Sequence, residues 1–154
     1  MDQERKQAPT TNSNQETGTG YLIVQVSTAR GAIPLEGARV DIRTYESENG
    51  SSPSTRGDVV ASLISGRDGN TIRLPLSAPP KAASAAPGNG RPYALYQAEV
   101  SMEGYYNQTY IGIPIFDGIT AIQPAVLIPL SENGTTGIPR PDDTSFFENP
   151  PSNL

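Results

Sequence analysis

Histidine and cysteine are both absent from the 154 residues of this chain. Their absence excludes disulfide bonds, thiolate nucleophiles, imidazole bases and the usual histidine and cysteine ligands of zinc and copper. Most hydrolytic mechanisms therefore lack a participant, so we expect no enzymatic activity and no cofactor. The missing cysteines do not fix the compartment, because many bacterial envelope and spore proteins also lack them.

Basic residues are fewer than acidic ones, 11 against 16, which gives a formal net charge of -5 and a pI of about 4.6. Such a chain repels phosphates, so we expect no nucleic-acid partner. The first twenty residues contain no apolar signal-peptide core, and no later run approaches the roughly 20 apolar residues of a membrane-spanning helix. We therefore expect no membrane insertion and no signal peptide within these residues.

Glycine and proline are abundant, with fifteen of each in a chain that is only 35% hydrophobic. Both residues interrupt regular structure, which predicts many turns and short strands. Residues 1–19 are polar and residues 133–154 are rich in proline and asparagine, so we expect disordered tails there. The folded part is predicted to be one β-domain at residues 20–132.

Alternating apolar and polar residues predict seven strands within this domain. Seven strands with turn residues at short spacing indicate a Greek-key β-sandwich. Prolines 114, 124 and 129 remove backbone donors, so their strands should be sheet edges or contain bulges. A long loop is expected at residues 77–92. The predicted strands are residues 21–28, 38–43, 58–65, 72–76, 94–103, 107–115 and 121–130.

Two of these strands have an apolar face that the alternation defines. In the sixth strand, Ile111, Ile113 and Ile115 share one face. The seventh strand is built around Ile122, Val126 and Ile128. We expect both sets to face the core.

Several segments resemble a known family. The sequence YLIVQVSTARGAIPLEGARVDIRT (21–44) resembles the start of carboxypeptidase-regulatory-like domains of the transthyretin-like β-sandwich group, and EGYY (103–106) fits the Gly-Tyr step before their penultimate strand. The segments TARGAIPLEGARV, DGNTIRLPLSAPP, RPYALYQAEVSMEGYY and IPIFDGITAIQPAVLIPL are similar to a domain of Firmicutes spore and cell-wall proteins. That domain accompanies clostridial spore cortex-lytic enzymes and peptidoglycan-binding modules.

The resemblance covers residues 20–130 and implies an accessory role. Neither a catalytic domain nor a peptidoglycan-binding repeat follows in this chain. We therefore expect a non-enzymatic accessory or structural module of a Gram-positive spore or cell-envelope system, with a protein or cell-wall glycan as partner. The alternatives are a glycan- or peptidoglycan-binding module, and a structural subunit of an assembled surface such as a spore appendage or a phage or tail-like particle. Oligomeric state and localisation stay open.

Carboxylates are the remaining acid-base groups. Glu99 and Glu103 lie on the outward face of one predicted strand, where we expect them to be solvated and to keep ordinary pKa values. Asp68 and Asp117 each stand in a single Asp-Gly turn, whereas a calcium site needs several carboxylates in a short loop. We therefore expect neither catalytic residues nor a metal site.

Aromatic residues supply the candidate binding surface. Four of them are predicted to be exposed and able to stack on sugars or anchor a protein partner: Tyr93, Tyr105, Tyr110 and Phe116. Tyr96 and Tyr106 are predicted to face the core. An adjacent pair in the C-terminal tail, Phe146 and Phe147, is either a docking motif or loosely packed on its own domain.

Overall fold

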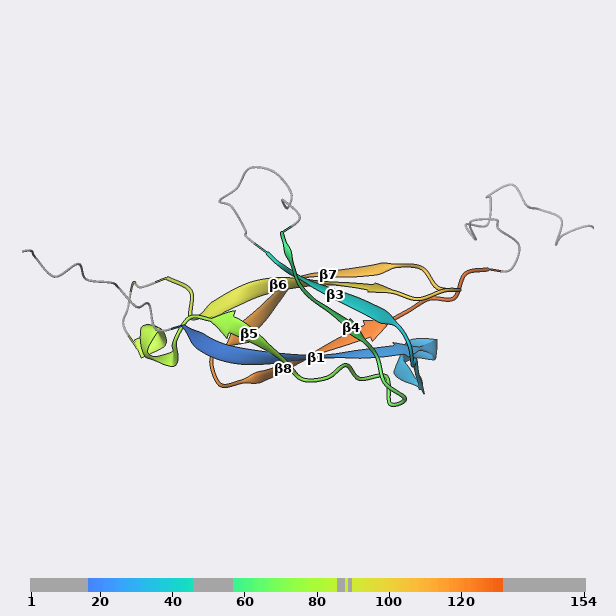
Figure 1. Ribbon diagram of the computed structural model, residues 1–154, viewed down its shortest axis with the longest axis horizontal. Coiled ribbons are helices and arrows are strands. Elements are labelled where there is room, and N and C mark those ends of the chain that lie inside the picture. Colours follow the sequence, from blue (N-terminus) through green and yellow to red (C-terminus); the bar gives the residue numbers. More distant parts are fainter. Residues whose placement is uncertain (1–16, 46–56, 86–87, 89, 132–154) are drawn as a thin grey trace, which may run out of the picture.

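The computed structural model describes residues 17–45, 57–85, 88 and 90–131, which form two facing four-stranded sheets (Figure 1). Sheet A contains β1 (Gly18–Thr28), β2 (Ile33–Pro34), β5 (Leu74–Ala78) and β8 (Thr120–Val126). Sheet B has the order β4 (Val59–Ile64), β3 (Arg39–Thr44), β6 (Tyr93–Ser101) and β7 (Gln108–Phe116). The all-β sandwich predicted from the sequence is confirmed, with eight strands in place of seven.

Strand β1 is the centre of sheet A. It pairs in parallel with β8 on one side and antiparallel with β5 and β2 on the other. In sheet B, β3 and β6 are central and β4 and β7 are edges. Pro114 and Pro124 therefore lie in the edge strands β7 and β8, as predicted, because an edge strand needs fewer backbone donors.

The core is formed by inward-facing residues of both sheets. Since successive side chains of a strand point to opposite faces, every second residue of β1 is buried from Gly20 to Thr28, and Val40 and Ile42 of β3 are buried. The largest fully buried side chains are those of Leu22, Ile42, Ile115, Leu127, Val24, Val26, Val40 and Val100.

The prediction for the sixth strand was wrong at one residue. Ile113 and Ile115 are buried, but Ile111 is 54% exposed. The β6–β7 ladder pairs Ile113 with Tyr96 and Ile111 with Gln97, so Gly112 is the extra residue of a β-bulge, with φ of 74°. A bulge changes the alternation of the strand, which moves Ile111 to the outer face.

The predicted register of the last strand was also wrong. Ile122, Val126 and Ile128 are exposed, whereas Ala125 and Leu127 are buried. Both sets of residues are apolar, so alternation alone did not distinguish them. The parallel pairing of β8 with β1 sets the face, and a shift of one residue exchanges the two sets.

The boundaries of one strand and one loop also differ from the predicted boundaries. The strand predicted at residues 72–76 begins only at Leu74, because the Thr71 hydroxyl accepts a hydrogen bond from the Val24 amide (3.0 Å) and Ile72 is left 69% exposed. The predicted loop at 77–92 contains the 3₁₀ turn η2 (Lys81–Ala85), and a second one, η1 (Ala29–Gly31), precedes β2.

The terminal predictions mostly fall outside the described residues. This holds for residues 1–16, residues 132–154 and the Phe146–Phe147 pair. The first strand begins at Gly18, earlier than the predicted residue 21. Among the described residues, no helix has the length and apolar character needed to cross a membrane.

Candidate functional site

The four predicted aromatic residues do not form one surface. Tyr93 and Phe116 are direct partners in the β6–β7 ladder, and their ring centroids lie 5.3 Å apart at 55°. Tyr105 lies in the turn at the other end of this hairpin, where it bridges to Pro129. Tyr110 is partly buried, and its hydroxyl accepts a hydrogen bond from the Val126 amide (3.1 Å).

Tyr105 and Tyr110 both pack against the core, so much of their surface serves the fold. Tyr96 is buried as predicted, and its hydroxyl donates to the Ser77 carbonyl (2.7 Å). Tyr106, which was predicted to face the core, is exposed instead. It lies in the turn before β7, where strand alternation no longer determines the direction of a side chain.

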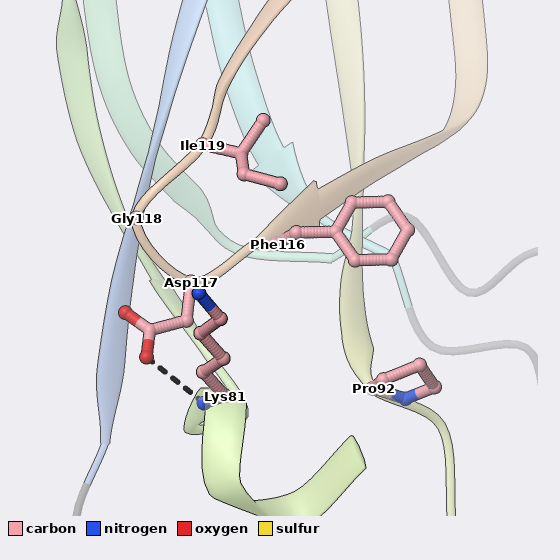
Figure 2. Close-up of a pocket in the computed structure, with 6 residues that line it drawn as sticks. All are labelled: Lys81, Pro92, Phe116, Asp117, Gly118 and Ile119. Carbon is pink, nitrogen blue, oxygen red and sulfur yellow. Dashed lines mark hydrogen bonds between the residues drawn. The ribbon is translucent and has the colours of Figure 1, made fainter. Parts of the chain in front are cut away.

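A pocket of about 390 Å³ lies beside Phe116 (Figure 2), and we call it the Phe116 pocket. Figure 2 shows the Phe116 ring and Pro92 on one side of it and Lys81 and Asp117 on the other. Its volume falls within the range of small-ligand sites, and most of its lining is apolar. The lining residues are Lys81, Pro92, Phe116, Asp117, Gly118 and Ile119.

The Asp117 side chain connects several segments at this end of the sandwich. Its Oδ1 accepts a hydrogen bond from the Thr19 amide (3.0 Å), and its Oδ2 accepts one from the Lys81 amide (2.9 Å). The hydrogen bonds from Lys81 and Thr19, with the Lys81 charge, hold the pKa of the Asp117 carboxyl below its usual range. Both oxygens therefore connect the turn between β7 and β8 to β1 and η2, and Asp117 has a structural role in the pocket wall.

The outer face of sheet B carries a network of charges. Arg39 donates to Asp41 (3.0 Å), and Arg43 lies 3.3 Å from a Glu99 oxygen. Partial burial raises the pKa of Asp41, but hydrogen bonds from Ser62 and Arg39 and the charges of Arg39 and Arg43 outweigh it and hold the pKa below its usual value.

Glu99 is therefore ion-paired and only about one-fifth exposed, and the prediction of a solvated Glu99 was wrong. The cause is that Arg43 of β3 and Gln97 of its own strand lie beside it, and the Gln97 amide donates to the other Glu99 oxygen (3.2 Å). Glu103 is exposed, as predicted. Within the part of the chain that the structure describes, acidic residues form no group of three or more that could hold a metal ion.

The outer face of sheet A has the opposite character. The outward residues of the β1–β8 pair include Ile23 opposite Ile122, Gln25 opposite Pro124, and Ser27 opposite Val126, and none of them is charged. Ile122 is 57% exposed. We call Ile23, Ile122, Pro124 and Val126 the sheet A apolar face. The sequence did not reveal this face because Ile122 and Val126 were assigned to the core.

Two polar features border the sheet A apolar face. The Arg73 guanidinium lies 3.5 Å from the centre of the Tyr21 ring, and its Nε donates to the Thr120 hydroxyl (3.0 Å). At the other end, a hollow of about 440 Å³ is lined by residues that include Arg30, Asp68 and Asn70. Hydrogen bonds from Asn70 hold the pKa of Asp68 below its usual range, so this carboxylate is ionised at neutral pH.

No protein-family model matches this chain. No curated protein matches it either. Among solved structures, it is similar to the GBS52 minor pilin of Streptococcus agalactiae, with 16% identity over 77% of this chain and 48% of that one and a TM-score of 0.47. The Bacillus anthracis TIE protein is 12% identical over 73% of this chain and 17% of that one, with a TM-score of 0.43.

The catechol 1,2-dioxygenase of Acinetobacter radioresistens is also similar, with 13% identity over 76% of this chain and 54% of that one and a TM-score of 0.48. The chain spans less than two thirds of the length of each of these three proteins. At such identities the likeness concerns the β-sandwich fold alone.

Proposed function

We propose that this chain is a non-enzymatic accessory or structural module that binds a protein partner through the sheet A apolar face. The observation that carries the proposal is the difference between the two outer faces. The two central strands of sheet B present Arg39, Asp41, Arg43 and Glu99, and exposed apolar residues lie on its edge strands β4 and β7, whereas the β1–β8 pair of sheet A presents isoleucine, proline and valine.

Exposed apolar residues gathered on one face commonly mark an interaction site, because water contact with them is unfavourable. A protein surface suits this face better than a glycan, since the side chains of Ile23, Ile122, Pro124 and Val126 have no hydrogen-bonding groups. Arg73 and Thr120 lie at its border, where a polar rim is typical of protein interfaces. An anionic lipid or nucleic acid is a poor partner for a chain of net charge -5.

The spore or cell-envelope context belongs to the same proposal and rests on the family resemblance of residues 20–130. The non-enzymatic role rests on the chemistry of the side chains. The chain has no histidine or cysteine. Of its carboxylates, Glu99 is ion-paired, and Asp41, Asp68 and Asp117 have pKa values below the usual range, which makes them poor general acids at neutral pH.

A photo-crosslinking residue at position 122 tests the proposed face in cells of the source organism. We expect crosslinks to one partner, which then binds the purified chain, and we expect Ile122→Lys to weaken that binding at least tenfold. The matched control is Arg39→Glu, which changes the charge on the outer face of sheet B. Equal loss in both variants, or crosslinks from position 39 and none from position 122, contradicts the proposal.

A glycan-binding role is the second candidate, and the Phe116 pocket favours it. A tilted aromatic pair, Tyr93 and Phe116, adjoins a pocket of about 390 Å³, and aromatic rings stack on sugar faces. Sedimentation with purified peptidoglycan tests it. Retention that Phe116→Ala abolishes and Tyr105→Ala preserves supports the pocket, and absence of retention in the wild-type chain rejects it.

A further inference from the structure

Proline is present in all but one of the strands at the sheet edges. Among the described residues, the edge strands β2, β5, β7 and β8 contain Pro34, Pro75, Pro114 and Pro124. Proline lacks a backbone donor, and its presence discourages pairing with another chain. The remaining edge strand, β4, has the sequence VVASLI, with neither a proline nor a charged residue, and its β-bulge at Val60 lies near its start, which leaves residues 61–64 regular.

Strand β4 also exposes apolar side chains and directs backbone groups away from its neighbour β3. Val60 is 47% exposed and Ile64 is 60% exposed. The Ser65 amide donates to the Ala38 carbonyl (2.9 Å), which places this amide on the β3 side. Because an antiparallel ladder alternates, the backbone groups of Ile64 and Ser62 point to the open side.

We propose that β4 pairs antiparallel with β4 of a second copy of this chain, about a two-fold axis at Ser62. Such an axis places Ser62 opposite Ser62 on the outer face and Ala61 opposite Leu63 on the inner face. Val60 is the extra residue of a β-bulge in the β3–β4 ladder and lies on the Ile64 side of the partner strand. The regular pairs join side chains of compatible chemistry.

The second copy is the occupant because the strand is complementary to itself. Residues on one face must pair with residues on the same face, and the axis at Ser62 satisfies this for Ala61, Ser62 and Leu63, the regular part of the strand about the axis. The same axis brings the open-side backbone groups of the two Ser62 residues together as a hydrogen-bonded pair. Two four-stranded sheets then become one continuous sheet of twice the width.

Charge does not oppose this pairing. The charged residues beside the strand are Asp58, which directly precedes it, and Arg39, Asp41 and Arg43 on β3, which pair with Ile64, Ser62 and Val59 of β4. In the dimer, the two β3 strands are three strand spacings apart, about 14 Å. This exceeds the screening length of about 8 Å at physiological ionic strength. The dimer edge also lies in sheet B, so it leaves the sheet A apolar face open.

A single introduced cysteine tests the axis directly, since the chain has no cysteine of its own. In the full-length Ser62→Cys variant, the two sulfurs of a dimer meet across the axis, because directly paired residues have Cα atoms about 5.5 Å apart, within disulfide range. We expect mild oxidation to give a covalent dimer of twice 16.3 kDa. The control Ile72→Cys, at an exposed residue outside the strands, should stay monomeric.

Sedimentation of the unmodified chain and of Ile64→Lys gives the second measurement. We expect a concentration-dependent dimer for the unmodified chain and a dissociation constant at least tenfold higher for Ile64→Lys, with an unchanged circular dichroism spectrum. The matched control Ile122→Lys, on sheet A, should dimerise normally. A monomer at all concentrations, a dimer that Ile64→Lys does not weaken, or equal crosslinking of both cysteine variants overturns the proposal.

Discussion

Ser65 offers a sharp test of how the sandwich is held together at the end of β4. Its side chain is buried, and its hydroxyl makes two hydrogen bonds: it donates to the Leu35 carbonyl (2.6 Å) and accepts from the Ala38 amide (2.9 Å). Ser65→Ala leaves both backbone groups without this partner in a dry environment. Each unsatisfied buried group costs about 1–3 kcal/mol, so we expect the free energy of unfolding to fall by about 2–6 kcal/mol.

Thermal unfolding followed by circular dichroism measures this loss. For a domain of roughly this size, 1 kcal/mol corresponds to about 4 °C, so Tm should fall by about 8–24 °C. The control is Ser77→Ala, whose side chain is exposed and should change the free energy of unfolding by less than about 0.5 kcal/mol. A Ser65→Ala protein as stable as the wild type would refute the role assigned to the hydroxyl.

Two further predictions concern other parts of the sandwich. Gly20→Ala should lower the free energy of unfolding by about 1–3 kcal/mol, because the added methyl group meets the Phe116 carbonyl oxygen where β1 passes β7. Urea titration measures this loss, and an unchanged midpoint of unfolding contradicts the close approach of the two strands. Hydrogen bonds from Ser62 and Arg39 lower the pKa of Asp41 in the folded protein. The ionised carboxylate therefore stabilises the fold above the unfolded-state pKa of about 3.8, and this stabilisation is lost as the pH falls through the folded-state pKa. The stability difference between wild type and Asp41→Asn should therefore shrink on acidification from pH 7 to pH 2, and a constant difference contradicts this reasoning.

The strands themselves were predictable because period-2 alternation is strong in β1, β3 and β6. The faces of β7 and β8 were not, for two physical reasons. A bulge at Gly112 changes the alternation within β7, and apart from the glycine itself no residue type in the sequence predicts this bulge. In β8, apolar residues occupy both faces, so only the pairing with β1 decides which set is buried.

The Phe116 pocket was predictable only in part. Phe116 and Tyr93 were selected as aromatic residues, and the structure brings these two together. The rest of the pocket depends on Asp117, whose hydrogen-bond partner Thr19 lies 98 residues away in the chain. Contacts across such separations arise from the packing of the two sheets, which residue patterns along a single sequence do not encode locally.

The parallel pairing of β1 with β8 has a mechanical consequence. Because the two strands run in the same direction, the chain enters the sandwich at the end where β1 begins and leaves at the opposite end, where β8 finishes (Figure 1). Tension applied at Gly18 and Val126 therefore acts along the ladder and loads its seven paired positions together in shear. A ladder loaded in shear resists force better than one opened pair by pair, so this arrangement suits a module that carries tension from one end of the sandwich to the other.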